Sequence, residues 1–177
     1  TFYNNFIRAD PAFKSRHIDI HSRAERFARN DAFFFSNSQY VRETQVLANV
    51  RSVLPSRSKF IYLPVNIPDG LSNTVFDREL IRRKYNLPKN FLFYATQLRP
   101  YKNVPLVLKA IAYLKKTGQE ISLVLTGDPY SDPECARIIR SSNLEASVVS
   151  IGTVDDQDLY RLYDAALGVV VPSLFEG

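Results

Sequence analysis

The second half of the chain alternates short apolar segments with longer amphipathic ones, and this alternation restricts the fold more than any other feature. The segment "ISLVLTG" (121–127) is almost continuously apolar, which is typical of a strand buried on both faces of a sheet. The segment 104–118 has apolar residues at helical spacing and ends at Gly118. The pattern predicts strands near 91–95, 121–126, 147–151 and 167–171, separated by helices near 104–118, 133–143 and 156–166. We therefore predict an α/β fold with a parallel sheet and helices on both faces.

The first half of the chain is separated from the second by a segment rich in turn residues. "AFFFSNS" (32–38) predicts a short buried strand that runs into a turn, and a further strand is expected from residue 58. Helices are expected near 16–30, 40–50 and 77–88. Prolines at 64 and 68 and a glycine at 70 mark a domain boundary, which we place between domains of residues 1–66 and 67–177. Residues 1–57 should then lie outside the sheet of the second domain.

Composition and charge exclude several classes of protein. No run approaches the about 18 apolar residues that a membrane-spanning helix needs. The net charge of +5 suits anionic partners, but the cations are scattered and no RNA-binding signature is present, so we expect no nucleic acid. His17 and His21 have helical metal-ligand spacing, but no acidic residue completes the pattern, so no metal is expected. The single cysteine, Cys135, excludes an internal disulfide.

The loops that follow the strands of such a sheet meet at one edge, where ligands of open α/β folds bind. The loop after the first predicted strand carries Gln97, Arg99 and Lys102 and leads into the helix at 104. A helix N-terminus offers amide groups and a partial positive charge, to which Lys102 and Arg99 add. This combination predicts a site for an anion, above all a diphosphate. In isolation, both cations are more simply read as ordinary surface residues.

The other loops at this edge contribute glycines and one late carboxylate. Gly127 and Gly152 each end a strand, and besides forming turns they allow a ligand to approach the backbone. Neither a dinucleotide-binding G-x-G-x-x-G nor a P-loop is present. Glu176 is the only carboxylate in the last loop, where it could accept hydrogen bonds from sugar or ribose hydroxyls, or simply be an exposed glutamate.

Four stretches share their order and spacing with a known family: "IYLPVNIPDG", "FLFYATQLRPYKN", "ISLVLTGD" and "VSIGTVDDQDLYRLYDAALGVVVPSLFEG". They resemble the nucleotide-sugar glycosyltransferases of family 4, well over residues 58–177 and weakly over 1–57, through "NDAFFFSNSQYVRETQV". The most specific part is the terminal P-S-x-x-E-G, which in the family opens a motif of two glutamates. The resemblance implies the GT-B fold, two Rossmann-like domains with the active site between them, of which only part is expected here.

The resemblance also implies a function and a set of site residues. Such enzymes transfer a sugar from a nucleotide-sugar donor, here expected to be UDP- or GDP-linked, to an acceptor hydroxyl, with retention and without a metal or other cofactor. Lys102 matches the lysine at the diphosphate, Glu176 the catalytic-site glutamate at the donor sugar, and Gly177 the start of a glycine-rich turn. Gln97 stands where the family usually has an arginine, a contact that Arg99 is expected to supply. The predicted donor-binding residues are Lys102, Arg99, Gln97, Gly127, Asp128, Phe175 and Gly177.

The expected enzyme is a hexosyl- or mannosyltransferase, and the alternative is a non-catalytic GT-B-like module that holds a nucleotide or a glycan. The chain begins at Thr1, has no methionine and ends inside the glutamate motif, so we expect a fragment that is inactive by itself. The acceptor, a sugar, a lipid-linked glycan or another hydroxyl compound, is expected to bind mainly outside the second domain. A cytoplasmic location is expected, with peripheral contact to the inner face of the membrane.

Overall fold

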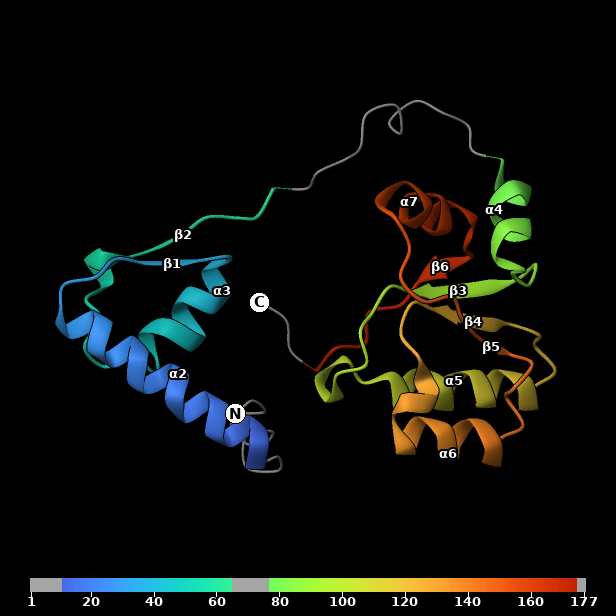
Figure 1. Ribbon diagram of the computed structural model, residues 1–177, viewed down its shortest axis with the longest axis horizontal. Helices are drawn as coiled ribbons and strands as arrows, with labels where there is room; N and C mark the ends of the chain where they lie inside the picture. Colours follow the sequence, from blue (N-terminus) through green and yellow to red (C-terminus); the bar gives the residue numbers. More distant parts are fainter. Residues whose placement is uncertain (1–10, 65–76, 175–177) are drawn as a thin grey trace. The chain divides into compact units, whose positions relative to one another are not determined.

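The computed structural model describes residues 11–64 and 77–174, with side chains of the first helix described from residue 19 onward. The chain divides into two compact units, one within Thr1–Asn66 and the other within Ile67–Leu174. The boundary predicted between residues 66 and 67 lies outside the described residues. The elements of both units are labelled in Figure 1.

The larger unit is built on a four-stranded parallel sheet in the order β5-β4-β3-β6 (Figure 1). Its strands are β3 (Phe91–Tyr94), β4 (Ser122–Leu125), β5 (Val148–Ser150) and β6 (Gly168–Val169). In register, Phe93 pairs with Val124 of β4 and with Val169 of β6. Every strand pair of this sheet is parallel, which confirms the predicted α/β fold with a Rossmann-like sheet.

Helices cover both faces of this sheet (Figure 1). On one face lie α5 (Val104–Lys116) and α6 (Pro133–Ser141), and on the other lie α4 (Arg78–Tyr85) and α7 (Asp156–Ala165). Strand residues alternate between the two cores: Leu123 and Leu125 belong to the α5–α6 side, and Val124 between them belongs to the α4–α7 side. All three side chains are fully buried. Burial on both faces explains why this strand is apolar at consecutive positions.

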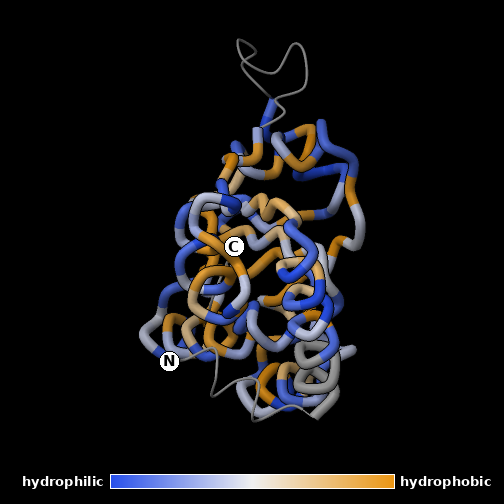
Figure 2. The backbone as a smooth tube through the Cα atoms, turned by 90° about the vertical axis from the view of Figure 1, so that its left-hand side faces the viewer, coloured by the Kyte–Doolittle hydropathy of each residue, from blue (hydrophilic) through white to orange (hydrophobic). Residues whose placement is uncertain are grey.

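The smaller unit contains the long helix α2 (Pro11–Arg29) and a two-stranded parallel sheet. Its strands are β1 (Phe34–Ser36) and β2 (Ser58–Phe60), with Phe34 opposite Ser58. The segment "AFFFS" therefore pairs with residues 58–60 and not with the larger sheet, as predicted. Figure 2 shows hydrophobic and hydrophilic residues alternating along the described chain.

The helix predicted over 40–50 is not a regular α-helix. It consists of a single turn, α3 (Gln39–Val41), followed by a π-helical stretch, η1 (Arg42–Leu47), while a short 3₁₀ turn, η2 (Pro55–Arg57), precedes β2. The Thr44 hydroxyl donates to the Tyr40 carbonyl at 2.7 Å, and the Asn49 amide donates to the Thr44 and Gln45 carbonyls. Side chains thus occupy carbonyls that α-helical amides would use, which gives a physical reason for the wider turn.

The helices of the larger unit begin in two different ways. Aspartate side chains cap α4, α6 and α7, where Asp77, Asp132 and Asp155 accept from first-turn amides. At α5 the N-cap residue is Asn103, whose side chain makes no capping hydrogen bond. In the parts of the chain that the structure describes, no helix is both long enough and apolar enough to cross a membrane.

Candidate functional site

The candidate site is the edge of the larger sheet where all four strands end at their carboxyl termini. Hydrogen bonds link the segments that leave this edge in the same order as the strands themselves. The Leu174 amide after β6 donates to the Tyr101 carbonyl after β3 at 2.8 Å. The Thr126 hydroxyl after β4 donates to the Thr96 carbonyl at 2.9 Å and accepts from the Thr96 amide at 2.9 Å. The Ser150 hydroxyl at the end of β5 donates to the Gly127 carbonyl at 3.0 Å. These contacts make the edge one connected surface.

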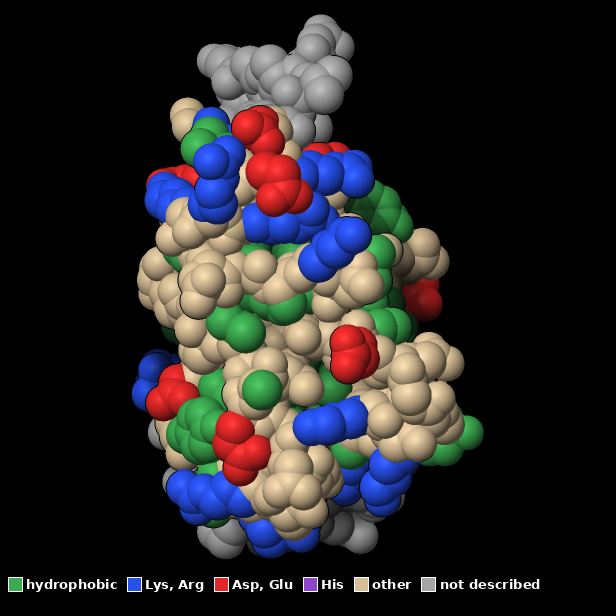
Figure 3. All heavy atoms as spheres, turned by 90° about the vertical axis from the view of Figure 1, so that its right-hand side faces the viewer, with side chains coloured by type: hydrophobic (Ala, Val, Ile, Leu, Met, Phe, Trp, Pro, Cys, Tyr) green, Lys and Arg blue, Asp and Glu red, His purple; other side chains and the backbone are tan. Residues whose placement is uncertain are grey.

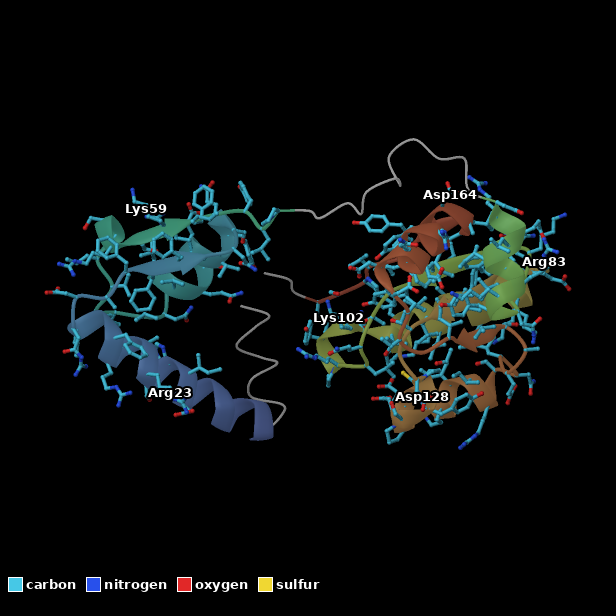
Figure 4. All side chains as sticks on the ribbon, turned by 45° about the horizontal axis from the view of Figure 1, so that its top comes forward. Arg23, Lys59, Arg83, Lys102, Asp128 and Asp164 are labelled. Atoms are coloured by element: carbon cyan, nitrogen blue, oxygen red, sulfur yellow. The ribbon has the colours of Figure 1, made fainter. Side chains whose placement is uncertain are left out.

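Lys102 lies in a tight turn between β3 and α5, which we call the lysine turn, residues Arg99–Asn103. The turn contains the 3₁₀ helix η3 (Pro100–Lys102), and the Lys102 amide donates to the Arg99 carbonyl at 2.9 Å. The Lys102 ammonium lies 5.2 Å from the centroid of the Tyr101 ring. Figure 4 shows Lys102 and Asp128 at the loop edge of the larger unit, with Arg83 on its opposite side. The structure therefore places Lys102 at the predicted edge.

The lysine turn leads directly into an N-terminus that no side-chain cap covers. Asn103 makes no capping hydrogen bond to the first turn of α5, and Pro105 has no amide proton to satisfy. The Leu106 amide donates to the Asn103 carbonyl at 3.1 Å, and the positive end of the helix dipole lies at the lysine turn. A cation beside a helix N-terminus that has no side-chain cap is a combination that suits a phosphate.

Gln97, two residues before the lysine turn, is hydrogen-bonded to Arg99 at its start. The Arg99 guanidinium donates to the Gln97 side-chain oxygen at 2.9 Å, and both residues are exposed. Gln97 therefore orients a cation in the loop where the family usually carries an arginine. The expectation that Arg99 supplies the phosphate contact of that arginine stays a prediction.

Gly127 and Asp128 have local structural roles that sequence reasoning missed. A Cβ atom on Gly127 would lie 2.3 Å from Leu98 Cδ1 and 3.0 Å from the Thr96 carbonyl oxygen, so the glycine makes room for the loop after β3. The Asp128 carboxylate accepts from the Tyr130 amide at 2.9 Å and caps η4 (Pro129–Ser131). The contacts of both residues with a donor stay predictions. Because Leu98 fills the space where a side chain of Gly127 would lie, we expect a donor to contact Gly127 through its backbone. Gly152 has a left-handed backbone, with φ of 71°.

Phe175, Glu176 and Gly177 lie outside the described residues, so the structure does not place the predicted catalytic glutamate. The segment that leads to them, Pro172–Leu174, is described and is hydrogen-bonded to the lysine turn. Within the described residues, the Ser173 hydroxyl oxygen is buried and has no hydrogen-bond partner.

Two titratable groups of the larger unit, Cys135 and Asp158, are buried and have perturbed pKa values. Burial, with Asp132 and Glu134 nearby, raises the pKa of the Cys135 thiol to about 12, so the thiol stays protonated in the core. Asp158 is buried between α4 and α7, on the other face of the sheet. Among the described residues, no group of three or more His, Cys, Asp or Glu side chains could hold a metal ion.

Sequence reasoning missed two residues of the edge that the structure brings forward, Tyr94 and Asn103. The Tyr94 hydroxyl donates to the Lys102 carbonyl at 2.8 Å from inside the core. Asn103 has a left-handed backbone, and its side chain donates to the Pro172 carbonyl at 3.3 Å. An asparagine between a turn and a Val-Pro helix start is a signal that could have identified the second of these.

Residues 77–177 match the family model of glycosyl transferases group 1. This match covers more than half of the chain, and the chain belongs to that family. No curated protein sequence matches the chain.

Solved glycosyltransferase structures share the fold. HepE from Anabaena, in complex with UDP and glucose, is similar with a TM-score of 0.64 and 20% identity over 80% of this chain and 38% of that chain. A glycosyltransferase from Rickettsia africae gives a TM-score of 0.66 and 18% identity over 84% of this chain and 41% of that one. The C-terminal domain of LpcC from Francisella tularensis gives a TM-score of 0.50 and 19% identity over 63% of this chain and 61% of that chain. This chain spans about two fifths of the first two proteins, and it has the Rossmann-like α/β architecture of GT-B glycosyltransferases.

Proposed function

We propose that the protein transfers a sugar from a nucleotide-sugar donor to an acceptor hydroxyl, as a family 4 hexosyl- or mannosyltransferase. The observation that carries this proposal is the lysine turn at the open N-terminus of α5. The diphosphate of such a donor is negatively charged and gains charge as the glycosidic bond breaks. A cation and amide groups fixed in advance at that position stabilise the growing charge without reorganising.

The ligands of similar proteins support a nucleotide-sugar donor. Structures of HepE from Anabaena contain UDP-glucose or UDP. The catalytic domain of starch synthase IV from Arabidopsis thaliana, similar with a TM-score of 0.52 and 20% identity over 82% of this chain and 34% of that one, is bound to ADP and acarbose. The lysine turn suits the diphosphate that all nucleoside diphosphates share, and we propose a UDP- or GDP-linked donor on the family resemblance.

The proposed roles follow from charge and position. Lys102, Arg99 and the positive end of the α5 dipole hold the diphosphate, and Gln97 orients Arg99. Glu176 contacts the donor sugar, with Phe175, Gly177, Gly127 and Asp128 forming the rest of the donor site. We propose that transfer proceeds with retention at the anomeric carbon and without a metal, since the cations and amides of the protein meet the charge of the leaving group.

The experiment that tests this proposal is a turnover assay on the intact protein with a panel of labelled UDP- and GDP-sugars and simple sugar or lipid-linked acceptors. We expect transfer from one donor, unchanged by a metal chelator, with NMR of the product reporting the same anomeric configuration as in the donor. Inversion at the anomeric carbon would contradict retention, and loss of activity with the chelator would contradict metal independence.

A non-catalytic nucleotide- or glycan-binding module is the second candidate, because Gln97 replaces an arginine that the family usually carries. Binding of a nucleotide sugar without either transfer or hydrolysis in the same assay would favour this candidate. We also propose a cytoplasmic location with peripheral contact to the inner face of the membrane, which cell fractionation tests.

A further inference from the structure

Three consecutive residues of the lysine turn are each held by a hydrogen bond from outside the turn. The Tyr101 carbonyl accepts from the Leu174 amide at 2.8 Å. The Lys102 carbonyl accepts from the Tyr94 hydroxyl at 2.8 Å. Asn103 donates its side-chain amide to the Pro172 carbonyl at 3.3 Å. The backbone on both sides of Lys102 is therefore fixed both to the core strand β3 and to the segment that follows β6.

Asn103 contributes to this arrangement in two ways. Its backbone is left-handed, with φ of 55° and ψ of 39°, which lets the 3₁₀ turn end at Lys102 and α5 begin at Val104. Asparagine tolerates this conformation better than most residues that carry a Cβ. Its side chain leaves the first turn of α5 uncapped and reaches Pro172, in the segment that follows β6.

The partner of Asn103 lies on the path to the predicted donor-sugar residue. Pro172–Leu174 lies between β6 and Glu176 in the sequence, and two hydrogen bonds join it to Tyr101 and Asn103, the residues on either side of Lys102. A shift of this segment therefore changes the restraint on the lysine turn, and an anion held by Lys102 in turn restrains the segment. Such reciprocal restraint is a coupling free energy between two parts of one site.

We propose that Asn103 is a positioning residue that couples Lys102 to the segment Pro172–Leu174, so that a diphosphate bound at the lysine turn also orders the approach to the donor sugar. This inference rests on the proposed function and assigns to Asn103 a role beyond ending a turn. It acts through Lys102 and needs no contact with the donor.

The first test compares Asn103→Gly with the unmodified protein in calorimetric titrations with UDP and GDP. Glycine keeps the left-handed backbone and removes only the side chain that reaches Pro172. One hydrogen bond corresponds to a loss of affinity of about three- to tenfold. The matched control is Asn86→Gly, since Asn86 is also left-handed, with φ of 49°, but ends α4 on the way into the opposite edge of the sheet. We expect the control to bind like the unmodified protein.

A double-mutant cycle with Lys102→Ala separates positioning from a general structural effect. If Asn103 acts through Lys102, adding Asn103→Gly to Lys102→Ala changes the affinity by no more than about twofold. Losses of affinity that simply add would contradict the proposal, as would an Asn103→Gly variant that binds as tightly as the unmodified protein.

A measurement on the unmodified protein keeps the proposal testable whatever the substitution does to folding. Saturation with the nucleotide that binds should slow hydrogen exchange at the Leu174 amide, while the amides around Asn86 are unaffected. Unchanged exchange at Leu174 in the saturated protein would overturn the coupling. If neither UDP nor GDP binds the unmodified protein, the proposed function itself fails, and that outcome is distinct from every result above.

Discussion

At the scale of single residues, the candidate site depends on a few side chains whose neighbours are already in place. Lys102 is a cation in a turn with three external hydrogen bonds, and Arg99 is oriented by Gln97. Gly127 is a glycine because Leu98 and the Thr96 carbonyl occupy the space that a side chain would need. Lys102 is proposed to act on the donor, whereas Gly127 serves packing, so their substitution should have different consequences.

Lys102→Ala should lower donor turnover without unfolding the protein. A charged hydrogen bond contributes roughly 1.5–3 kcal/mol, so we expect turnover to fall on the order of ten- to a hundredfold. The fold should survive because Lys102 is not part of either core cluster. Steady-state rates and a thermal melt measure both effects. Parental turnover in the variant would show that the anion is held elsewhere.

Gly127→Ala should destabilise the larger unit, because its new methyl group would meet a backbone oxygen as well as Leu98. Overpacking of this kind costs about 1–3 kcal/mol of unfolding free energy. Gly168→Ala is the control, since its Cβ would meet only Leu92 Cδ2 at an ordinary 3.7 Å. Urea unfolding of both variants measures the difference, and equal stabilities would mean that the loop after β3 moves aside freely.

At the scale of elements, α4 and α7 are held together by charged groups as well as by apolar packing. Asp158 of α7, only 1% exposed, accepts from Tyr85 at 2.6 Å and from Arg161 at 3.2 Å, and it also contacts Lys84. A second, exposed ion pair between the two helices joins the Arg78 guanidinium to the Asp164 carboxylate at 3.0 Å. Figure 3 shows cations and carboxylates interspersed on this side of the molecule. The buried carboxylate should matter more than the exposed pair, because water screens the latter.

The stability of the larger unit should depend on pH through Asp158. Burial raises the pKa of this carboxyl, but the hydrogen bonds from Lys84 and Tyr85 outweigh it and hold the pKa below its usual value of 3.8. A lowered folded-state pKa means that this contribution is complete above the usual value and is lost as the pH falls through the folded-state value. We expect stability to decline below about pH 4 and Asp158→Ala to flatten that decline.

At pH 7, Asp158→Ala should cost about 1–3 kcal/mol of unfolding free energy, because it removes the hydrogen bonds that Tyr85 and Arg161 make to a buried carboxylate. Asp164→Ala, which removes the exposed pair, should cost at most about 1 kcal/mol. Urea unfolding of the unmodified protein and of both variants, at pH 7 and at pH 3, measures the loss of unfolding free energy for each variant at each pH. A steeper decline at low pH in Asp158→Ala than in the unmodified protein would contradict this account.

At the scale of the whole molecule, the two units differ in how much they bury. The larger unit has two core clusters, whereas the smaller has a two-stranded sheet with exposed aromatic residues such as Phe33 and Phe35, at 62% and 66%. Isolated two-stranded sheets are marginally stable. We therefore expect hydrogen exchange to be slowest in β3 and β4 and much faster in β1 and β2. Equal protection in both sheets would show that the smaller unit is stabilised by contacts that its own described residues do not provide.

The sequence could predict the larger fold because local and global signals agree there. Apolar runs such as Leu123–Leu125 are buried on both sides, and each amphipathic run became a helix. It could also predict that Lys102, Arg99 and Gln97 share one edge. The packing of Leu98 over Gly127 and the reach of Asn103 to Pro172 could not be predicted, because both join residues that are distant in sequence. The π-helical turn at 42–47 was missed for a different reason, since local side-chain hydrogen bonds there override the periodic pattern.

The central claim is that a diphosphate binds at the lysine turn and the N-terminus of α5. Mapping of backbone amide chemical shifts during titration of the isotopically labelled protein with UDP and GDP tests it most directly. The account predicts that the largest shifts with at least one of these nucleotides fall on Arg99, Lys102, Asn103 and Leu106, and that they disappear in Lys102→Ala. Shifts that centre on the opposite edge of the sheet, around Asn86 and Asn90, would contradict it.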